Sequence, residues 1–127
     1  MEITTQISDH LGAYLDISSQ ELKLTAANMA NVDTPNYRTV GIDFAGEMQR
    51  AIAAATAARE VGESAGTANI SSMHQVDGLL ERPDGNNVSM DREGLNMAEA
   101  QLRFRTGVEL LRREFSRIQS AIQIDGK

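Results

Sequence analysis

Mostly apolar side chains recur with an unbroken 4-3 spacing through the last third of the chain. The positions of this seam are Met90, Gly94, Met97, Gln101, Phe104, Val108, Leu111, Phe115, Ile118 and Ile122. Residues spaced alternately four and three apart follow one face of an α-helix, and such a seam predicts packing against a second helix. We therefore expect a single C-terminal helix of roughly 50 Å. Gly94 and Gln101 weaken the upper part of its seam.

The same segment carries a second apolar strip beside the seam. Leu95, Ala98 and Leu102 form this strip, and Leu110 lies further along the chain. A helix with a single partner needs only one seam, so the broader surface predicts that the N-terminal half of this helix meets more than one neighbour. Ser89 is the expected N-cap, because its hydroxyl can accept hydrogen bonds from backbone NH groups of the first turn.

Another 4-3 pattern begins near the N-terminus. Its positions are Leu11, Leu15, Ser18, Leu22, Thr25, Met29 and Val32. The pattern predicts a helix from about residue 5 to residue 32, roughly 40 Å long. Thr4, Thr5 and Ser8 are all candidate N-caps. Because both seams are interrupted by polar residues or glycine, we expect the isolated chain to be only partly folded at its ends.

Residues 27–38, with the sequence ANMANVDTPNYR, end the N-terminal helical pattern. Pro35 cannot continue a helix and pushes Thr34 into an extended conformation, so we expect the helix to end at about Val32. Asn36 suits a turn, since asparagine bonds the local backbone and tolerates positive φ. Tyr37 offers an amphipathic ring that can anchor the chain as it leaves this hinge.

The middle of the chain predicts a short helix followed by a long loop. Asp43 can cap the helix. One face of this helix carries Phe44, Met48, Ile52 and Ala55. Gly62, Gly66 and the Ser/Thr-rich residues 64–72 end it, and we expect a loop with at most a short hairpin up to Asn87. Turn signals occur at Asp77-Gly78 and Asp84-Gly85.

The predicted fold class is therefore mainly α: long N- and C-terminal helices pair as a coiled coil or helical bundle, and the middle segment contains a short helix and loops with room for a small β element. We expect one structural domain made of three segments. They are residues 1–38 (N-terminal helix and hinge), 39–87 (short helix plus flexible loop-rich middle) and 88–127 (C-terminal helix). Residues 88–127 carry 7 basic and 6 acidic side chains, whereas residues 1–60 carry 4 and 8, which gives mild charge complementarity between the two ends.

Composition and motifs argue against several classes of function. The formal net charge of -6 disfavours a nucleic-acid surface, and the absence of cysteine removes disulfides and thiolate chemistry. His10 and His74 have no second ligand or nucleophile at a suitable spacing, so we expect no catalytic, cofactor or metal site and no enzyme. The first residues lack a secretory signal and no run is long enough to span a membrane, features that alone indicate a cytoplasmic protein.

The residue order of the hinge resembles the signature of the axial proteins of the bacterial flagellum, which form its rod, hook and hook-filament junction. Asn28, Asn31, Thr34, Pro35 and Tyr37 carry this signature. The family usually has glycine where this chain has Asn36, which is the next best residue for a left-handed turn. Residues 84–93 (DGNNVSMDRE) and the segment from Leu110 to Ile122 also resemble the C-terminus of the rod proteins.

This resemblance implies a structural subunit of the proximal rod in the flagellar basal body, assembled helically, transmitting torque, surrounding the export channel and required for motility. It implies export from the cytoplasm through the flagellar type III apparatus into the periplasmic rod, without a cleaved signal peptide. The implied partners are further copies of the chain, the rod proteins FlgC and FlgF, the rod-to-membrane-ring adaptor FliE and the export apparatus.

We predict that assembly uses the signature residues together with the lower seam of the C-terminal helix. The seam residues are Phe104, Val108, Leu111, Phe115, Ile118 and Ile122. The alternative, based on acidic charge and amphipathic helices alone, is a soluble helical secretion chaperone or regulatory adaptor. Such a protein would fold and dimerise by itself, which distinguishes the two hypotheses.

Overall fold

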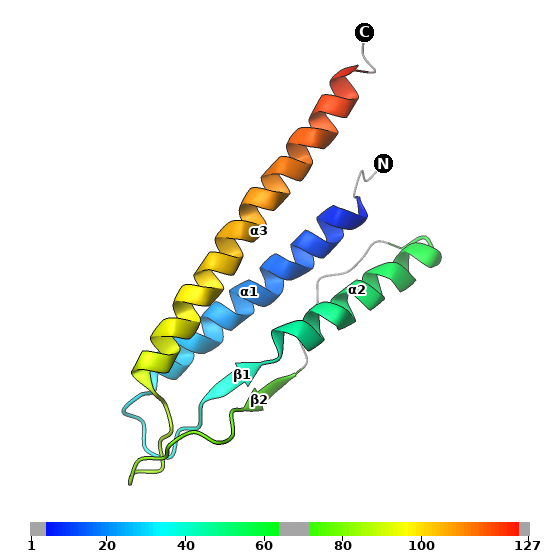
Figure 1. The fold of residues 1–127 in the computed structure, drawn as a ribbon. Helices are drawn as coiled ribbons and strands as arrows, with labels where there is room; N and C mark the ends of the chain where they lie inside the picture. Colours follow the sequence, from blue (N-terminus) through cyan, green and yellow to red (C-terminus); the bar gives the residue numbers. More distant parts are fainter. Residues whose placement is uncertain (1–4, 64–71, 125–127) are drawn as a thin grey trace.

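The computed structural model describes residues 5–63 and 72–124. Within these residues the chain forms α1 (Gln6–Ala30), β1 (Val40–Ile42), α2 (Phe44–Glu60), β2 (Met73–Gln75) and α3 (Met90–Ile124). The helices lie side by side, with α1 between α3 and α2 (Figure 1). The mainly α fold is confirmed, with long terminal helices packed together and a small two-stranded sheet in the middle.

The first helix begins with one of the three caps expected from the sequence. The hydroxyl of Thr5 accepts a hydrogen bond from the backbone NH of Ser8 at 3.1 Å, and the Ser8 hydroxyl accepts one from the NH of Thr5 at 2.9 Å. This reciprocal capping box satisfies two backbone donors at the helix start. At the other end α1 stops at Ala30, slightly earlier than expected, and Asn31 is its C-cap. Thr4 lies outside the described residues.

The long helices α1 and α3 run antiparallel. The side chain of Asn28, near the end of α1, donates a hydrogen bond to Glu93, near the start of α3, at 3.0 Å. The hydroxyl of Thr5, just before α1, donates one to Glu114 at 2.8 Å. Residues 115–124 therefore extend roughly 15 Å beyond the start of α1. Figure 1 shows this extension at the red end of α3.

The face of α3 that contacts α1 is turned by one position from the expected seam. Its buried residues recur every seventh position: Glu93, Ala100, Gly107 and Glu114. Half of the predicted seam is half-buried: Met97, Phe104, Val108, Leu111 and Ile118. The other half is exposed: Met90, Gly94, Gln101, Phe115 and Ile122. The expectation that Phe115 points into the contact with α1 is wrong, because this side chain is 56% exposed.

Small residues explain the shift in register. At Gly107 an added Cβ would lie 2.8 Å from Cδ2 of Leu15 and 3.0 Å from Cδ1 of Tyr14, so the two helices approach too closely there for any side chain. Ala100 is completely buried at the equivalent position one heptad earlier. Close approach of the backbones at small residues places the larger apolar side chains at the flanks of the contact.

The middle helix α2 packs on the side of α1 away from α3. The ring of Phe44 meets that of Tyr14 edge to face, with centroids 5.3 Å apart. Arg59, in the last turn of α2, forms an ion pair of 2.6 Å with Asp9 of α1. Asp43 occupies the N-cap position as expected, although its side chain makes no capping hydrogen bond. Gly66, expected to help end α2, lies outside the described residues.

The middle segment was expected to hold at most a short hairpin, and its small sheet pairs strands that are distant in the chain. Strands β1 and β2 flank α2 in the chain and pair antiparallel, with Val40 opposite Gln75 and Ile42 opposite Met73. The chain nevertheless bends at both predicted positions, where Gly78 and Gly85 have φ of +76° and +81°. The sheet joins the segment that leaves the hinge to the segment that leads into α3 (Figure 1).

The interior of the described part is small and partly polar. Its buried hydrophobic residues are Ile17, Ala55, Val88 and Ala100. Buried polar residues outnumber them and include Ser18, Thr25, Asn28, Thr39, Asn86 and Asn87. Among the described helices, none has a segment long and apolar enough to cross a membrane.

Candidate assembly site

Asn28 is the centre of a set of buried polar side chains that joins the end of α1 to the start of α3. Its amide nitrogen donates to the carbonyl of Val40 at 2.9 Å and to Glu93 at 3.0 Å. Its amide oxygen accepts from the NH of Val40 and the hydroxyl of Tyr37, both at 3.1 Å. The side chain is 2% exposed and uses both donors and both acceptors that an asparagine offers.

A second asparagine, Asn86, connects the turn after α1 to the loop before α3. Its buried side chain donates to the carbonyls of Asn31 and Thr34, at 2.9 and 2.8 Å. Its side-chain oxygen accepts from the NH of Val88 at 2.8 Å. The side chain of Asn31 donates back to the carbonyl of Ala27, which stabilises the end of α1. Asn86 therefore adds a second hydrogen bond to two carbonyls just after α1, each of which already accepts one from the backbone.

The hinge itself needs a left-handed residue. Asn36 has a φ of 61°, as its position in the signature predicts, and its NH donates to the carbonyl of Asp84 at 2.9 Å. Gly85 packs against it so closely that an added Cβ would lie 2.5 Å from the side-chain oxygen of Asn36. Residues 84–87 and 27–38, the two segments with the family resemblance, are thus in direct contact.

Asn87 completes the connection on the other side of the loop. Its side-chain oxygen accepts a hydrogen bond from the NH of Thr39 at 2.7 Å, and its own NH donates to the carbonyl of Tyr37 at 3.3 Å. We call this arrangement the hinge cluster. It consists of Asn28, Asn31, Tyr37, Thr39, Asn86, Asn87 and Glu93.

Glu93 is the one member of the hinge cluster that is incompletely satisfied. The residue is 1% exposed, and one carboxylate oxygen, Oε2, accepts the hydrogen bond from Asn28. The other oxygen, Oε1, is buried and has no hydrogen-bond partner within the described part of the chain. A buried acceptor without a partner typically costs about 1–3 kcal/mol, so this oxygen stands out from its neighbours.

Arg103 links all three helices next to the hinge cluster. One of its guanidinium nitrogens donates to both carboxylate oxygens of Glu21, at 2.9 and 2.7 Å. The guanidinium also lies over the ring of Phe44, 4.6 Å from its centroid. Burial lowers the pKa of Arg103, but the hydrogen bond to Glu21 and the charges of Glu21 and Glu99 outweigh this effect, so the pKa is raised.

The structure divides the predicted assembly residues between two places. Asn28, Asn31, Thr34, Pro35 and Tyr37 lie in or beside the hinge cluster. Phe104, Val108 and Leu111 lie half-buried along α3. Phe115, Ile118 and Ile122 lie beyond the start of α1, and we call them the distal seam. The role of all these residues in assembly stays a prediction.

Two features of this region were missed by sequence reasoning. The sequence places Glu93 in the first turn of the C-terminal helix, where a negative charge suits the helix dipole, whereas the structure also buries it against Asn28. Thr39 was not singled out, although it is 2% exposed and bonded to Asn87. A usable signal existed for Glu93, because it shares seven-residue spacing with Ala100, Gly107 and Glu114. That line was overlooked since it contains no large apolar residue.

Neither histidine lies in the hinge cluster. His10 is half-buried on α1, and its Nε2 atom is buried without a hydrogen-bond partner among the described residues. His74 is exposed on β2. That neither histidine has a catalytic or metal-binding role stays a prediction.

Comparison with known proteins identifies the family. No family model matches the chain. It is 32% identical over 125 residues to the flagellar basal body rod protein FlgB of Salmonella typhimurium, covering 86% of this chain and 87% of that protein. It is also 32% identical over 126 residues to FlgB of Cereibacter sphaeroides, covering 94% and 98%. Escherichia coli FlgB is 28% identical over 123 residues, covering 86% and 87%. The chain therefore belongs to the FlgB family, whose members are components of the flagellar basal body rod.

Proposed function

We propose that this chain is a non-catalytic structural subunit of the proximal rod, and that copies of it assemble helically through α1 and α3. The observation that carries the proposal is the imbalance between buried and exposed apolar side chains. The described residues bury four hydrophobic side chains and leave eleven large ones exposed. A monomeric protein rarely leaves so much of its large apolar surface uncovered, so neighbouring subunits are the natural cover.

The exposed apolar side chains of α3 occupy two different surfaces. The strip of Leu95, Ala98 and Leu102, which we call the outer strip, faces away from α1, and Leu95 and Leu102 are 75% and 66% exposed. The distal seam lies at the other end of the same helix. Contacts between two different surfaces of identical subunits form a closed ring only if the rotation between neighbouring subunits allows it. Otherwise they generate a helical assembly.

The hinge cluster has a separate role in this proposal. It fixes the angle between the long helices and the sheet before any subunit is added, because its hydrogen bonds lie within one chain. A preformed bend lowers the conformational entropy that assembly has to overcome. The rod built in this way transmits torque, surrounds the export channel and is required for motility.

The proposed partners follow from the same role. They are FlgC and FlgF in the rod, the adaptor FliE at the membrane ring, and the export apparatus that delivers the chain from the cytoplasm without a cleaved signal peptide. We retain the division into residues 1–38, 39–87 and 88–127 as part of this proposal. The chaperone or adaptor alternative is less well supported, since each curated relative above carries the name of a rod protein.

Deletion and complementation of the gene in a flagellated host that carries it test the proposal. The deletion strain should lack motility, and electron microscopy of its basal bodies should show no complete rod. Expression of the wild-type chain should restore both, and the protein should copurify with the basal bodies. Complete rods in the deletion strain would contradict the proposal, as would a chain that restores motility while remaining in the cytoplasm.

A further inference from the structure

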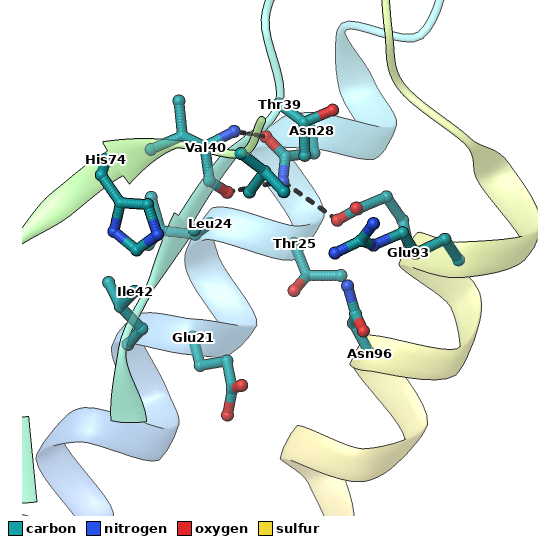
Figure 2. A pocket seen from close by; sticks show the side chains of 13 residues that line it. Glu21, Leu24, Thr25, Asn28, Thr39, Val40, Ile42, His74, Glu93 and Asn96 are labelled. Atoms are coloured by element: carbon teal, nitrogen blue, oxygen red, sulfur yellow. Dashed lines mark hydrogen bonds between the residues drawn. The ribbon is translucent and has the colours of Figure 1, made fainter. Parts of the chain in front are cut away.

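A cavity of about 250 Å³ opens between α1, α3 and the small sheet (Figure 2). Leu24 of α1 and Val40 and Ile42 of β1 form an apolar part of its wall. Glu21 and Thr25 of α1, with Glu93 and Asn96 of α3, form a polar part (Figure 2). The cavity is therefore amphipathic, with carboxylates on its polar side.

Glu93 lines this cavity, and its unsatisfied oxygen is buried next to it. Because Oε2 is already bonded to Asn28, the free hydrogen-bonding capacity of the carboxylate is concentrated on Oε1. The last torsion of a glutamate side chain is soft, so a small rotation can present Oε1 to a group that enters the cavity. That group has to be a hydrogen-bond donor, and a cationic donor makes the strongest hydrogen bond to a carboxyl group.

A metal ion fits this cavity poorly. The described residues bring together no group of three His, Cys, Asp or Glu side chains that could hold one. A long basic side chain fits both walls, because its methylene groups can pack on Leu24, Val40 and Ile42 while its charged end reaches the carboxylate. The volume is ample for one arginine or lysine side chain.

Among the described residues, neither of the two arginines near the cavity fills this role. Arg103 is bound to Glu21 and Glu99. Arg92 lines the cavity, yet forms no ion pair with Glu93 within the described part of the chain. Arg92 is exposed, so solvent and salt weaken its effect on an entering cation.

We propose that the cavity is a socket for an arginine or lysine side chain of a neighbouring rod subunit, and that Glu93 is the residue that binds it. This inference rests on the proposed function, since it requires that the chain meets a neighbour. It makes the hinge cluster a docking site as well as an internal support. Buried charge pairs between subunits contribute strongly to specificity, because an unpaired charge in the wrong complex is costly.

The test compares two identical substitutions on α3. Glu93→Gln keeps an oxygen that accepts from Asn28 but removes the negative charge. Glu109→Gln is the matched control, because Glu109 is exposed and lies outside the cavity. We expect the thermal unfolding midpoint of both purified variants to stay close to that of the wild type. Incorporation of Glu93→Gln into basal bodies should fall at least about tenfold, the usual effect of losing one partner of a buried charge pair.

A second variant supplies the cation from within the chain. Asn96 points into the cavity beside Glu93 (Figure 2), so the lysine of Asn96→Lys should fill it and pair with the carboxylate. We expect this variant to unfold at a temperature higher by about 3 °C and yet to incorporate poorly, because the socket is occupied. A purely structural role for Glu93 predicts the first effect without the second.

The outcomes separate this inference from the proposed function. If the wild-type chain is not found in rods, the proposed function fails. If the wild type is incorporated and both Glu93→Gln and Asn96→Lys are incorporated equally well, only the socket is wrong. Poor incorporation of the two variants, with a normal Glu109→Gln control and folded proteins throughout, supports the socket.

Discussion

The two ends of the α1–α3 pair differ in what they leave unsatisfied. At the hinge end, buried asparagines meet nearly all of their hydrogen-bonding requirements within the chain. At the other end, Phe115 and Ile122 are each 56% exposed. A chain whose buried polar groups are hydrogen-bonded internally, and whose apolar side chains remain exposed, is suited to fold first and to assemble afterwards. The difference also separates mutations that unfold the chain from mutations that block assembly.

The largest effect on folding is expected at the hinge end, for Asn28→Ala. The substitution removes four hydrogen bonds and leaves Tyr37, Glu93 and both polar groups of the Val40 backbone without their partner. Since an unsatisfied buried group costs about 1–3 kcal/mol, we expect a loss of about 3–5 kcal/mol in the free energy of unfolding. Urea denaturation followed by circular dichroism measures it.

Asn31→Ala is the control for that experiment. Its side-chain bonds to Ala27 and Thr34 are exposed, so the loss should stay below about 1.5 kcal/mol. Equal losses for the two variants would show that burial at Asn28 contributes little to stability. That result would contradict the proposed difference between the hinge end and the distal end.

A pair of phenylalanines on α3 tests the contrast along one helix. Phe104 is half-buried against α1, whereas Phe115 is mostly exposed. Truncation of Phe104 to alanine should cost about 2–3 kcal/mol of stability, and truncation of Phe115 less than about 1 kcal/mol. Phe115→Ala should nevertheless be incorporated into rods far less than the wild type, although it is synthesised normally.

Arg113→Ala serves as the exposed control on the same helix. It should be milder than Phe115→Ala in motility and in rod incorporation, and should barely change stability. If Arg113→Ala impaired assembly as much as Phe115→Ala, the apolar distal seam would not be the surface that neighbours use.

Alanine substitutions at two glycines of α3 test the contact between α1 and α3, with smaller expected changes in stability. An added methyl at Gly107 meets Leu15 and Tyr14, whereas at Gly94 nothing lies within 4 Å of it. Gly107→Ala should cost about 1–2 kcal/mol, because overpacking outweighs the gain in helix propensity. Gly94→Ala should stabilise the protein by up to about 1 kcal/mol. Thermal unfolding of both variants decides it, and a stabilised Gly107→Ala would contradict the close helix approach.

The smallest effect is expected for the histidines. His10→Gln and His74→Gln should leave motility and rod assembly unchanged, because no metal-binding group lies around either residue in the described part of the chain, and glutamine keeps a polar side chain where His74 lines the cavity. Swarming assays on soft agar compare the variants with the wild type. Loss of motility in His74→Gln, with the protein abundant and exported, would show that this account of the sheet is incomplete.

The sequence predicts the helices well and the contact between them less well. Periodicity over many residues places α1 and α3, and Pro35 places the hinge, because these signals are local. The phase of the α3 contact was wrong by one position. A hydrophobic pattern gives weight to Phe115 and Ile122, but the helices meet where Ala100 and Gly107 allow close approach. The larger residues remain available for neighbours.

Long-range features were harder to predict. Strand β2 has the sequence Met73-His74-Gln75, which gives no strand signal, and it forms only because β1 lies beside it. The burial of Glu93 likewise depends on Asn28, far away in the sequence. The signature residues can be recognised by resemblance, whereas their hydrogen bonds are visible only in the structure.

Hydrogen exchange along α3 tests the central claim most directly, namely that the hinge end of α3 is already held by α1 within one chain, whereas its distal end is held only by neighbours. In the purified monomer, amides near Ala100 and Gly107 should exchange slowly, and amides of residues 115–124 should exchange rapidly. In isolated rods the distal amides should also become protected. Strong protection of residues 115–124 in a proven monomer, or no change on assembly, would contradict the account.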